Sequence, residues 1–182
     1  MILTRSAHVV QTSDARLKRL AAQIEALTEK DEKLKRHTQE ILALRLAAAR
    51  ELWTICAGFV GSLNGLLERD VVVLDPDTFT ADTFQESGPN LLQINVRGRI
   101  LQVEFQATGE LTSTEDFRIP YTLAGSVRAF NQALLDKDLI EEQLLFCTME
   151  RETGMWRFFD PRTYRSGPFD ASYLTSLMEQ IV

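Results

Sequence analysis

The chain has 182 residues, of which 45% are hydrophobic and 25% are charged. These proportions are typical of a globular protein and exclude wholesale disorder, and the length suits one domain with an extension rather than two full-sized domains. The charge is uneven, because residues 1–50 carry ten basic and six acidic side chains whereas residues 51–182 carry ten and twenty. The acidic second part argues against nucleic acid or a membrane as partner.

Residues 14–69 are predicted to form one long helix. The chain has no proline before Pro76 and no glycine before Gly58, and Thr12 or Ser13 can cap the helix start. Apolar residues recur at first with intervals of three, four and three residues, which is the spacing of a coiled coil. This apolar seam comprises Leu17, Leu20, Ile24, Leu27, Leu34, Ile41, Leu44, Leu52, Ile55 and Phe59.

The predicted helix is too long for the rest of the chain to cover. At about 1.5 Å per residue it would span roughly 84 Å, far more than a small domain. We therefore expect the seam to be the interface of a homo-oligomer, with the chain itself as partner. Asp31 and Thr38 interrupt the seam, so the alternative is a break near His37, giving an antiparallel hairpin within one chain.

The stretch from Leu52 to Leu67 contains no charged residue but three glycines. A membrane-spanning helix needs about 20 apolar residues, so this shorter stretch is interpreted as a helix surrounded by protein. Asn64 and Gly65 could end it. Residues 70–90 are expected to be a linker, in which Val71 to Leu74 could form a short strand.

Residues 91–182 predict an α+β domain. Leu92–Arg97 and Leu101–Ala107 alternate apolar and polar side chains, which indicates two half-buried strands joined by a turn at Gly98. A third strand is expected around Phe117–Leu123, at an edge of the sheet because Pro120 cannot donate a backbone hydrogen bond.

The remaining elements complete an antiparallel sheet with helices on one face. A helix is expected to start at Ser126 and to bury Val127, Phe130 and Leu134. A second hairpin then pairs Leu144–Glu150 with Met155–Phe159, and Asp170 caps a last helix whose apolar face contains Leu174, Leu177, Met178 and Ile181. The expected order is helix-βββ-α-ββ-α, with a flexible N-terminus at 1–13, an oligomerisation region at 14–69, the linker and an α+β domain at 91–182.

The sequence contains no motif for catalysis, and we expect no catalytic, metal-binding or cofactor-binding residue. Its histidines, His8 and His37, lie near the start of the chain and in the predicted helix, away from any expected cleft. Cys56 and Cys147 are far apart in apolar surroundings and are expected to be buried, reduced thiols. The start of the chain lacks the pattern of a secretory signal, so a cytoplasmic protein is expected.

The segment from Trp156 to Pro168 is rich in arginine and aromatic residues within an otherwise acidic domain. One interpretation is a recognition loop that binds a partner through Arg162, Tyr164 and Arg165. The other is a structural loop, in which Trp156 and Phe158 point into the core and Arg162 pairs with Asp160 or another nearby acid.

These patterns predict a homo-oligomeric scaffold or adaptor whose α+β domain binds another, unidentified protein. A peptide-binding chaperone or regulatory module is the alternative, which would require an apolar groove or an exposed sheet edge. An enzyme that acts through carboxylates on a phosphate or sugar is a further alternative, which would require acidic residues that converge in a pocket.

Overall fold

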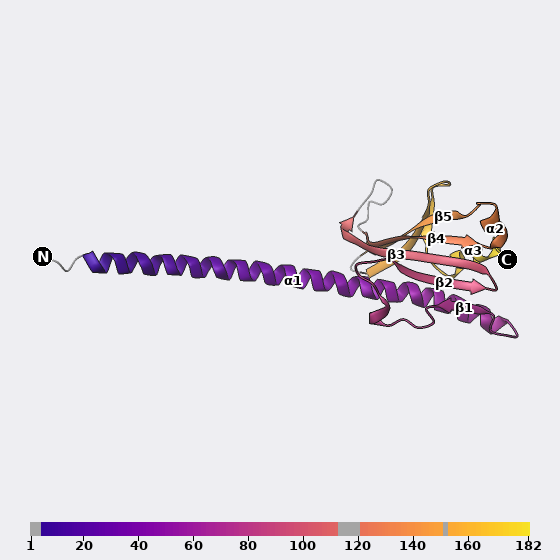
Figure 1. Ribbon diagram of the computed structural model, residues 1–182, viewed down its shortest axis with the longest axis horizontal. Coiled ribbons are helices and arrows are strands. Elements are labelled where there is room, and N and C mark those ends of the chain that lie inside the picture. The colour runs from indigo at the N-terminus through magenta and orange to yellow at the C-terminus, as the bar shows by residue number, and fades with distance from the viewer. Residues whose placement is uncertain (1–4, 113–120, 151–152) are drawn as a thin grey trace. The chain divides into compact units, whose positions relative to one another are not determined.

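The computed structural model describes residues 5–112, 121–150 and 153–182. Its first element is α1 (Arg5–Leu66), a continuous helix of 62 residues (Figure 1). The expected long helix is therefore present, it starts earlier than residue 14, and it has no break near His37. The chain divides into two compact units, residues 1–41 and residues 42–182, which are described separately.

The second unit is built on an antiparallel sheet whose spatial order follows the chain. Among the described residues, its seven strands are β1 (Val72–Asp75), β2 (Asn90–Val96), β3 (Arg99–Thr112), β4 (Tyr121–Phe130), β5 (Glu141–Glu150), β6 (Thr153–Asp160) and β7 (Arg165–Pro168). Three short helical elements accompany them, namely η1 (Ala81–Thr83), α2 (Gln132–Asp136) and α3 (Ala171–Glu179).

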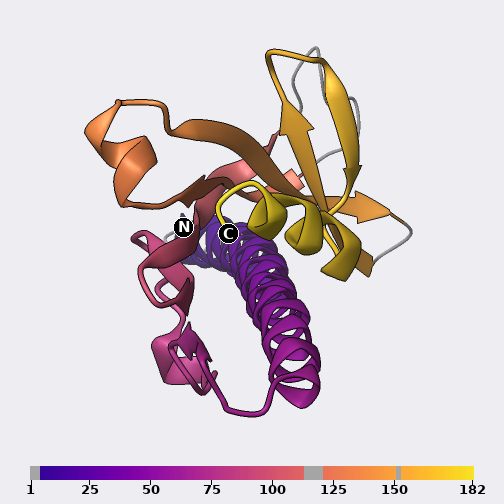
Figure 2. The ribbon, with the colours of Figure 1, turned by 90° about the vertical axis from the view of Figure 1, so that its right-hand side faces the viewer.

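The sheet curls around residues 42–66 of α1 and around α3, which cover the same face (Figure 2). Trp156 links strand and helix, since its indole Nε1 donates a hydrogen bond to the Ala48 carbonyl oxygen at 2.7 Å. Alternate residues of the strands face this core, as half-buried antiparallel strands require. The fully buried side chains are led by Phe105, Leu52, Ile94, Leu101, Leu123, Leu145, Leu174 and Ile181.

Several predicted elements are confirmed. β2 and β3 form the expected hairpin, with the turn at Arg97 and Gly98. β5 and β6 form the second hairpin. The carboxylate of Asp170 caps α3 by accepting a hydrogen bond from the backbone nitrogen of Tyr173 at 2.9 Å. All four residues expected on the inner face of this helix are buried.

The helix expected from Ser126 is wrong, because β4 runs through this segment. Ser126 is paired with Glu104 on one side and Leu144 on the other. The backbones are tightly packed here, since a Cβ added to Gly125 would lie 1.9 Å from the Glu104 carbonyl oxygen. The spacing of Val127, Phe130 and Leu134 by three and four residues therefore does not mark a helix here. α2 begins only after Asn131, whose side chain caps it.

Two other expectations about the sheet also need correction. β4 lies between β3 and β5 and is not an edge strand, while Pro120 lies outside the described residues. Residues 70–90 contain η1 and the short strand expected near Val71 to Leu74, which is β1 and pairs with β2. The segment rich in arginine ends in β7, which pairs with β6. The fold is thus α+β, with a different order of elements from the one expected.

Candidate functional site

The most distinctive surface feature of the first unit is an apolar stripe on α1. Every described side chain from residue 14 to residue 40 is exposed, including those of the predicted seam. Leu17, Leu20, Ile24, Leu27 and Leu34 are between 51% and 65% exposed. Large apolar side chains scattered singly are normal on a surface, but five that recur along one side of a helix form an unpartnered face. We call these five residues the exposed stripe.

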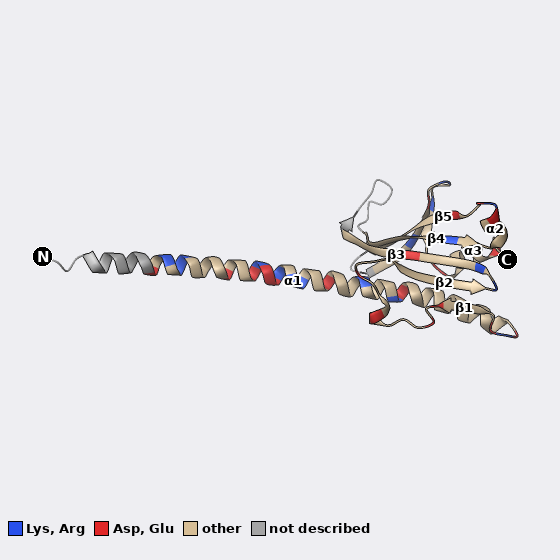
Figure 3. Cartoon of the chain, in the orientation of Figure 1, with Lys and Arg blue, Asp and Glu red and all other residues tan. Residues whose placement is uncertain are grey.

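Charged residues of both signs are distributed along α1 (Figure 3). Within residues 14–41 there are seven lysines and arginines and six aspartates and glutamates, so the segment is almost neutral. One of these pairs is intrahelical, with the Lys18 Nζ 3.3 Å from an Asp14 carboxylate oxygen. Both side chains are exposed, so this pair contributes little to helix stability.

The C-terminal half of the predicted seam has a different role. Leu52 is fully buried and Phe59 is 5% exposed, and both belong to the core formed with the sheet. Ile41, Leu44 and Ile55 are half-buried. The assignment of Leu52 and Phe59 to an interface between copies is therefore corrected, because their side chains are already covered within the chain.

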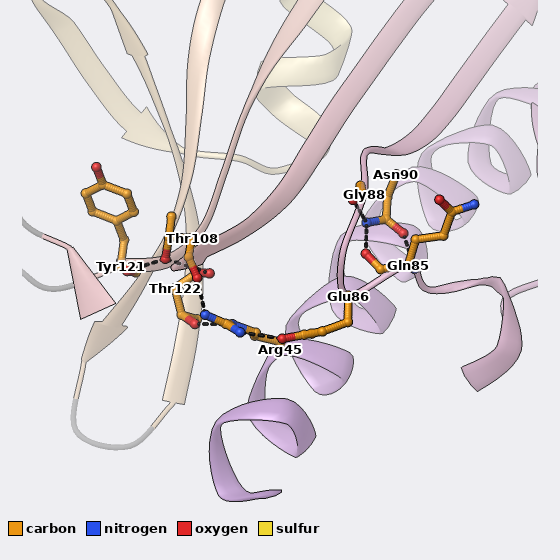
Figure 4. Close-up of polar contacts among 8 residues, drawn as sticks. All are labelled: Arg45, Gln85, Glu86, Gly88, Asn90, Thr108, Tyr121 and Thr122. Atoms are coloured by element: carbon orange, nitrogen blue, oxygen red, sulfur yellow. Dashed lines mark hydrogen bonds and ion pairs between the residues drawn. The ribbon is translucent and has the colours of Figure 1, made fainter. Parts of the chain in front are cut away.

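A buried arginine lies on the same helix and joins it to the sheet (Figure 4). The Arg45 Nε donates a hydrogen bond to the Thr122 Oγ1 at 2.8 Å, and its two other nitrogens contact the Glu86 carboxylate and the Thr108 carbonyl oxygen. Asn90 holds the loop that carries Glu86, through hydrogen bonds to the backbone nitrogen and oxygen of Gln85 at 2.7 and 2.9 Å.

Arg45, Thr122, Glu86 and Thr108 form what we call the Arg45 cluster, a structural clamp in which all three guanidinium nitrogens are engaged within the second unit. The second carboxylate oxygen of Glu86 is buried and accepts no hydrogen bond from the described residues. The role of Arg45 was not predicted from the sequence. The sequence does contain one indication of a buried role. Counting in steps of seven residues from Ile24 and Asp31 leads to Arg45, which places this arginine on the apolar side of the helix. A charge at such a position requires a buried partner, but only the fold identifies which one.

The three residues expected to bind a partner are not equivalent. Arg162 makes ion pairs with Glu141 and Asp160, the latter at 3.3 Å. Hydrogen bonding from Arg162 lowers the pKa of Glu141, and the pKa of Asp160 is also lowered although desolvation opposes this. Arg162 therefore stabilises its own loop, whereas Tyr164, which is 78% exposed, and the exposed Arg165 remain open to solvent.

Arg165 lines a cavity of about 330 Å³ beside α3. Asp160 and Asp170 line it as well, so positive and negative side chains face the same space. An adjoining hollow of about 430 Å³ lies between α2 and α3 and shares Gln143 with the first. With one arginine against two aspartates, the lining does not favour an anion, and it holds no group of acids that converge on one point.

Other kinds of site were sought within the described residues. In that part of the chain, no group of three or more His, Cys, Asp and Glu side chains is placed to hold a metal ion. None of the described helices is both long enough and apolar enough to cross a membrane. Cys56 and Cys147 are free and buried, and desolvation raises the pKa of each thiol to about 12.

Comparison with known proteins found no matching family model, no matching curated protein and no matching solved structure.

Proposed function

We propose that the protein is a scaffold that self-associates through residues 14–41 of α1 and thereby brings copies of its α+β unit together. The observation that carries this proposal is the exposed stripe, whose five leucine and isoleucine side chains are more than half exposed. Their spacing is that of a coiled-coil seam, in which each apolar side chain packs into a hole on a facing helix.

A second copy of the same segment is the partner that fits best. A seam of alternating three- and four-residue intervals is complementary to another seam of the same kind. The seven basic and six acidic side chains of residues 14–41 leave a net charge near zero, so two copies do not repel each other as a whole. A strongly charged partner, in contrast, would gain little from this balanced surface.

The size of the stripe predicts a weak, reversible complex. Covering the exposed half of one leucine or isoleucine contributes about 1 kcal/mol, as half of the roughly 1.5–3 kcal/mol for complete burial. Ten such side chains in a dimer give about 10 kcal/mol, against an association cost of about 4–15 kcal/mol. We therefore expect an assembly that depends on concentration and dissociates on dilution.

The experiment is sedimentation of the full chain over a range of concentrations, with Ile24→Asp as the disrupting variant. A carboxylate at the centre of the seam would be buried without a partner and should abolish association. Ala22→Asp is the matched control, because it places the same carboxylate on the same helix but off the stripe. A wild-type chain that stays monomeric at all concentrations, or equal loss in both variants, would contradict the proposal.

Binding of another protein by the α+β unit stays a prediction. Tyr164 and Arg165 are the expected contact residues that remain exposed, while the guanidinium of Arg162 is engaged by acids of its own chain. The alternative of a peptide-binding chaperone is less well supported. The edge strand β7 has only four residues and ends at Pro168, and the outer backbone groups of Val72 in the edge strand β1 are occupied by a side chain of α1.

A further inference from the structure

The charged residues beside the exposed stripe would attract or repel each other differently in a parallel and in an antiparallel pair of helices. Extending the stripe by its seven-residue repeat gives one row of side chains with Leu17, Ile24 and Asp31, and a second row with Leu20, Leu27 and Leu34. The side chains that flank the stripe are then Asp14, Arg16, Ala21, Gln23, Thr28, Lys30, Lys35 and His37.

A parallel pair of helices would bring like charges together. Equivalent residues face each other across a parallel seam, so Asp31 would face Asp31 of the second copy. Flanking side chains five residues apart also meet in this arrangement, which would place Lys30 of each copy beside Lys35 of the other. Three unfavourable contacts would thus lie within the segment that has to associate.

An antiparallel pair avoids these contacts in one register. With Ile24 opposite Leu27 of the second copy, Leu17 lies opposite Leu34, and Asp31 lies opposite Leu20 rather than another carboxylate. Shifting this register by one repeat in either direction brings Lys30 against Lys30, or Arg16 against Lys30. In the favoured register Asp14 lies opposite Lys35 at both ends of the interface, giving two attractive pairs.

We propose that the second copy binds the exposed stripe antiparallel to the first, with Ile24 opposite Leu27 and Asp14 opposite Lys35. This inference rests on the proposed self-association and specifies its geometry. The copies are then related by a two-fold axis, so the interface closes as a dimer and does not extend into a filament. Asp31, which interrupts the apolar seam, disfavours the parallel alternative.

A change of charge at Lys35 distinguishes the two arrangements, because it should weaken an antiparallel dimer and strengthen a parallel one. In the antiparallel dimer Lys35→Glu places two carboxylates opposite each other at both ends, so the dissociation constant should rise roughly tenfold. In a parallel dimer the same change would turn the contact with Lys30 into an attractive one and tighten binding. Adding Asp14→Lys to Lys35→Glu reverses both charges and should restore the wild-type constant.

The measurement is the dimer dissociation constant from sedimentation equilibrium at low salt and neutral pH. The differences among the variants should disappear at about 1 M salt, where charges are screened within about 3 Å. Tighter binding or no change in Lys35→Glu, or no rescue by the double variant, would overturn the antiparallel geometry while leaving self-association intact. A wild-type chain without any dimer would instead overturn the proposed function itself.

Cross-linking provides an independent readout. A Leu17→Cys chain mixed with a tagged Leu34→Cys chain should form a mixed disulfide dimer. Neither variant alone should cross-link, because residues 17 of the two copies would be roughly 25 Å apart along the helix. Both native cysteines are buried thiols with raised pKa values and remain unreactive in the folded chain. Cross-linking of either variant with itself would overturn the proposal.

Discussion

The side-chain amide of Asn64 pairs with both backbone polar groups of Val72. Its Nδ2 donates to the Val72 carbonyl oxygen at 2.9 Å, and its Oδ1 accepts from the Val72 backbone nitrogen at 3.1 Å. Asn64 is in α1 and Val72 is in the edge strand β1, so one amide from the helix takes the place of a neighbouring strand. Covering the backbone groups of Val72 in this way leaves fewer free groups at this edge for another chain to pair with.

Replacing Asn64 with alanine should therefore destabilise the α+β unit and expose its edge. Two backbone groups of Val72 lose their partners, and we expect the free energy of unfolding to fall by about 1–2 kcal/mol. Urea unfolding at a concentration where the chain is monomeric measures this change, and light scattering reports any aggregation through the edge. Ser62→Ala, at an exposed position on the same helix, should have almost no effect. Equal destabilisation of both variants would contradict the role of Asn64.

Removing the buried Arg45 should have a larger effect. An Arg45→Met chain keeps much of the side-chain volume but leaves the Glu86 carboxylate and the Thr108 carbonyl oxygen without this donor. We expect a loss of about 2–3 kcal/mol in the free energy of unfolding, because removing the buried arginine leaves a partly buried carboxylate and a carbonyl oxygen without their donor.

The control for Arg45 is Arg50→Met on the exposed side of the same helix. Arg50 lies over the ring of Phe79 at 5.6 Å, a contact that contributes less than about 1 kcal/mol at an exposed site. Chemical unfolding of both variants separates the two effects. A loss for Arg45→Met as small as that for Arg50→Met would show that the clamp does not hold the helix to the sheet.

The ion pairs of Arg162 predict a dependence on pH. The pKa values of Glu141 and Asp160 are lowered in the folded chain from ordinary values of 4.5 and 3.8. A carboxyl group whose pKa falls on folding stabilises the protein above its unfolded pKa, and this stabilisation is lost as the pH drops through the folded value. Arg162→Ala should therefore lower the urea midpoint slightly at pH 7 and have no effect once both acids are protonated. A difference between wild type and variant that persists in that acid range would contradict the ion pairs.

Local sequence patterns were sufficient to predict an element where the residues favour only one type of secondary structure. Alternating side chains predicted β2 and β3, and the absence of proline and early glycine predicted a long helix, because both elements satisfy their backbone hydrogen bonds in the simplest repeating way. At Ser126 the spacing of Val127, Phe130 and Leu134 predicts one face of a helix, whereas the segment up to Phe130 belongs to β4. Pairing with strands on both sides decided in favour of the sheet, and no local pattern contains that information.

The sequence by itself determined that a helix longer than one small domain carries an apolar seam, and that an acidic α+β domain follows it. Only the tertiary structure decided how that seam is divided. Leu52 and Phe59 are covered by the chain's own sheet, whereas Leu17 to Leu34 remain exposed. The physical reason is that periodicity shows which side of a helix is apolar, but burial depends on the segments, distant in sequence, that pack against it.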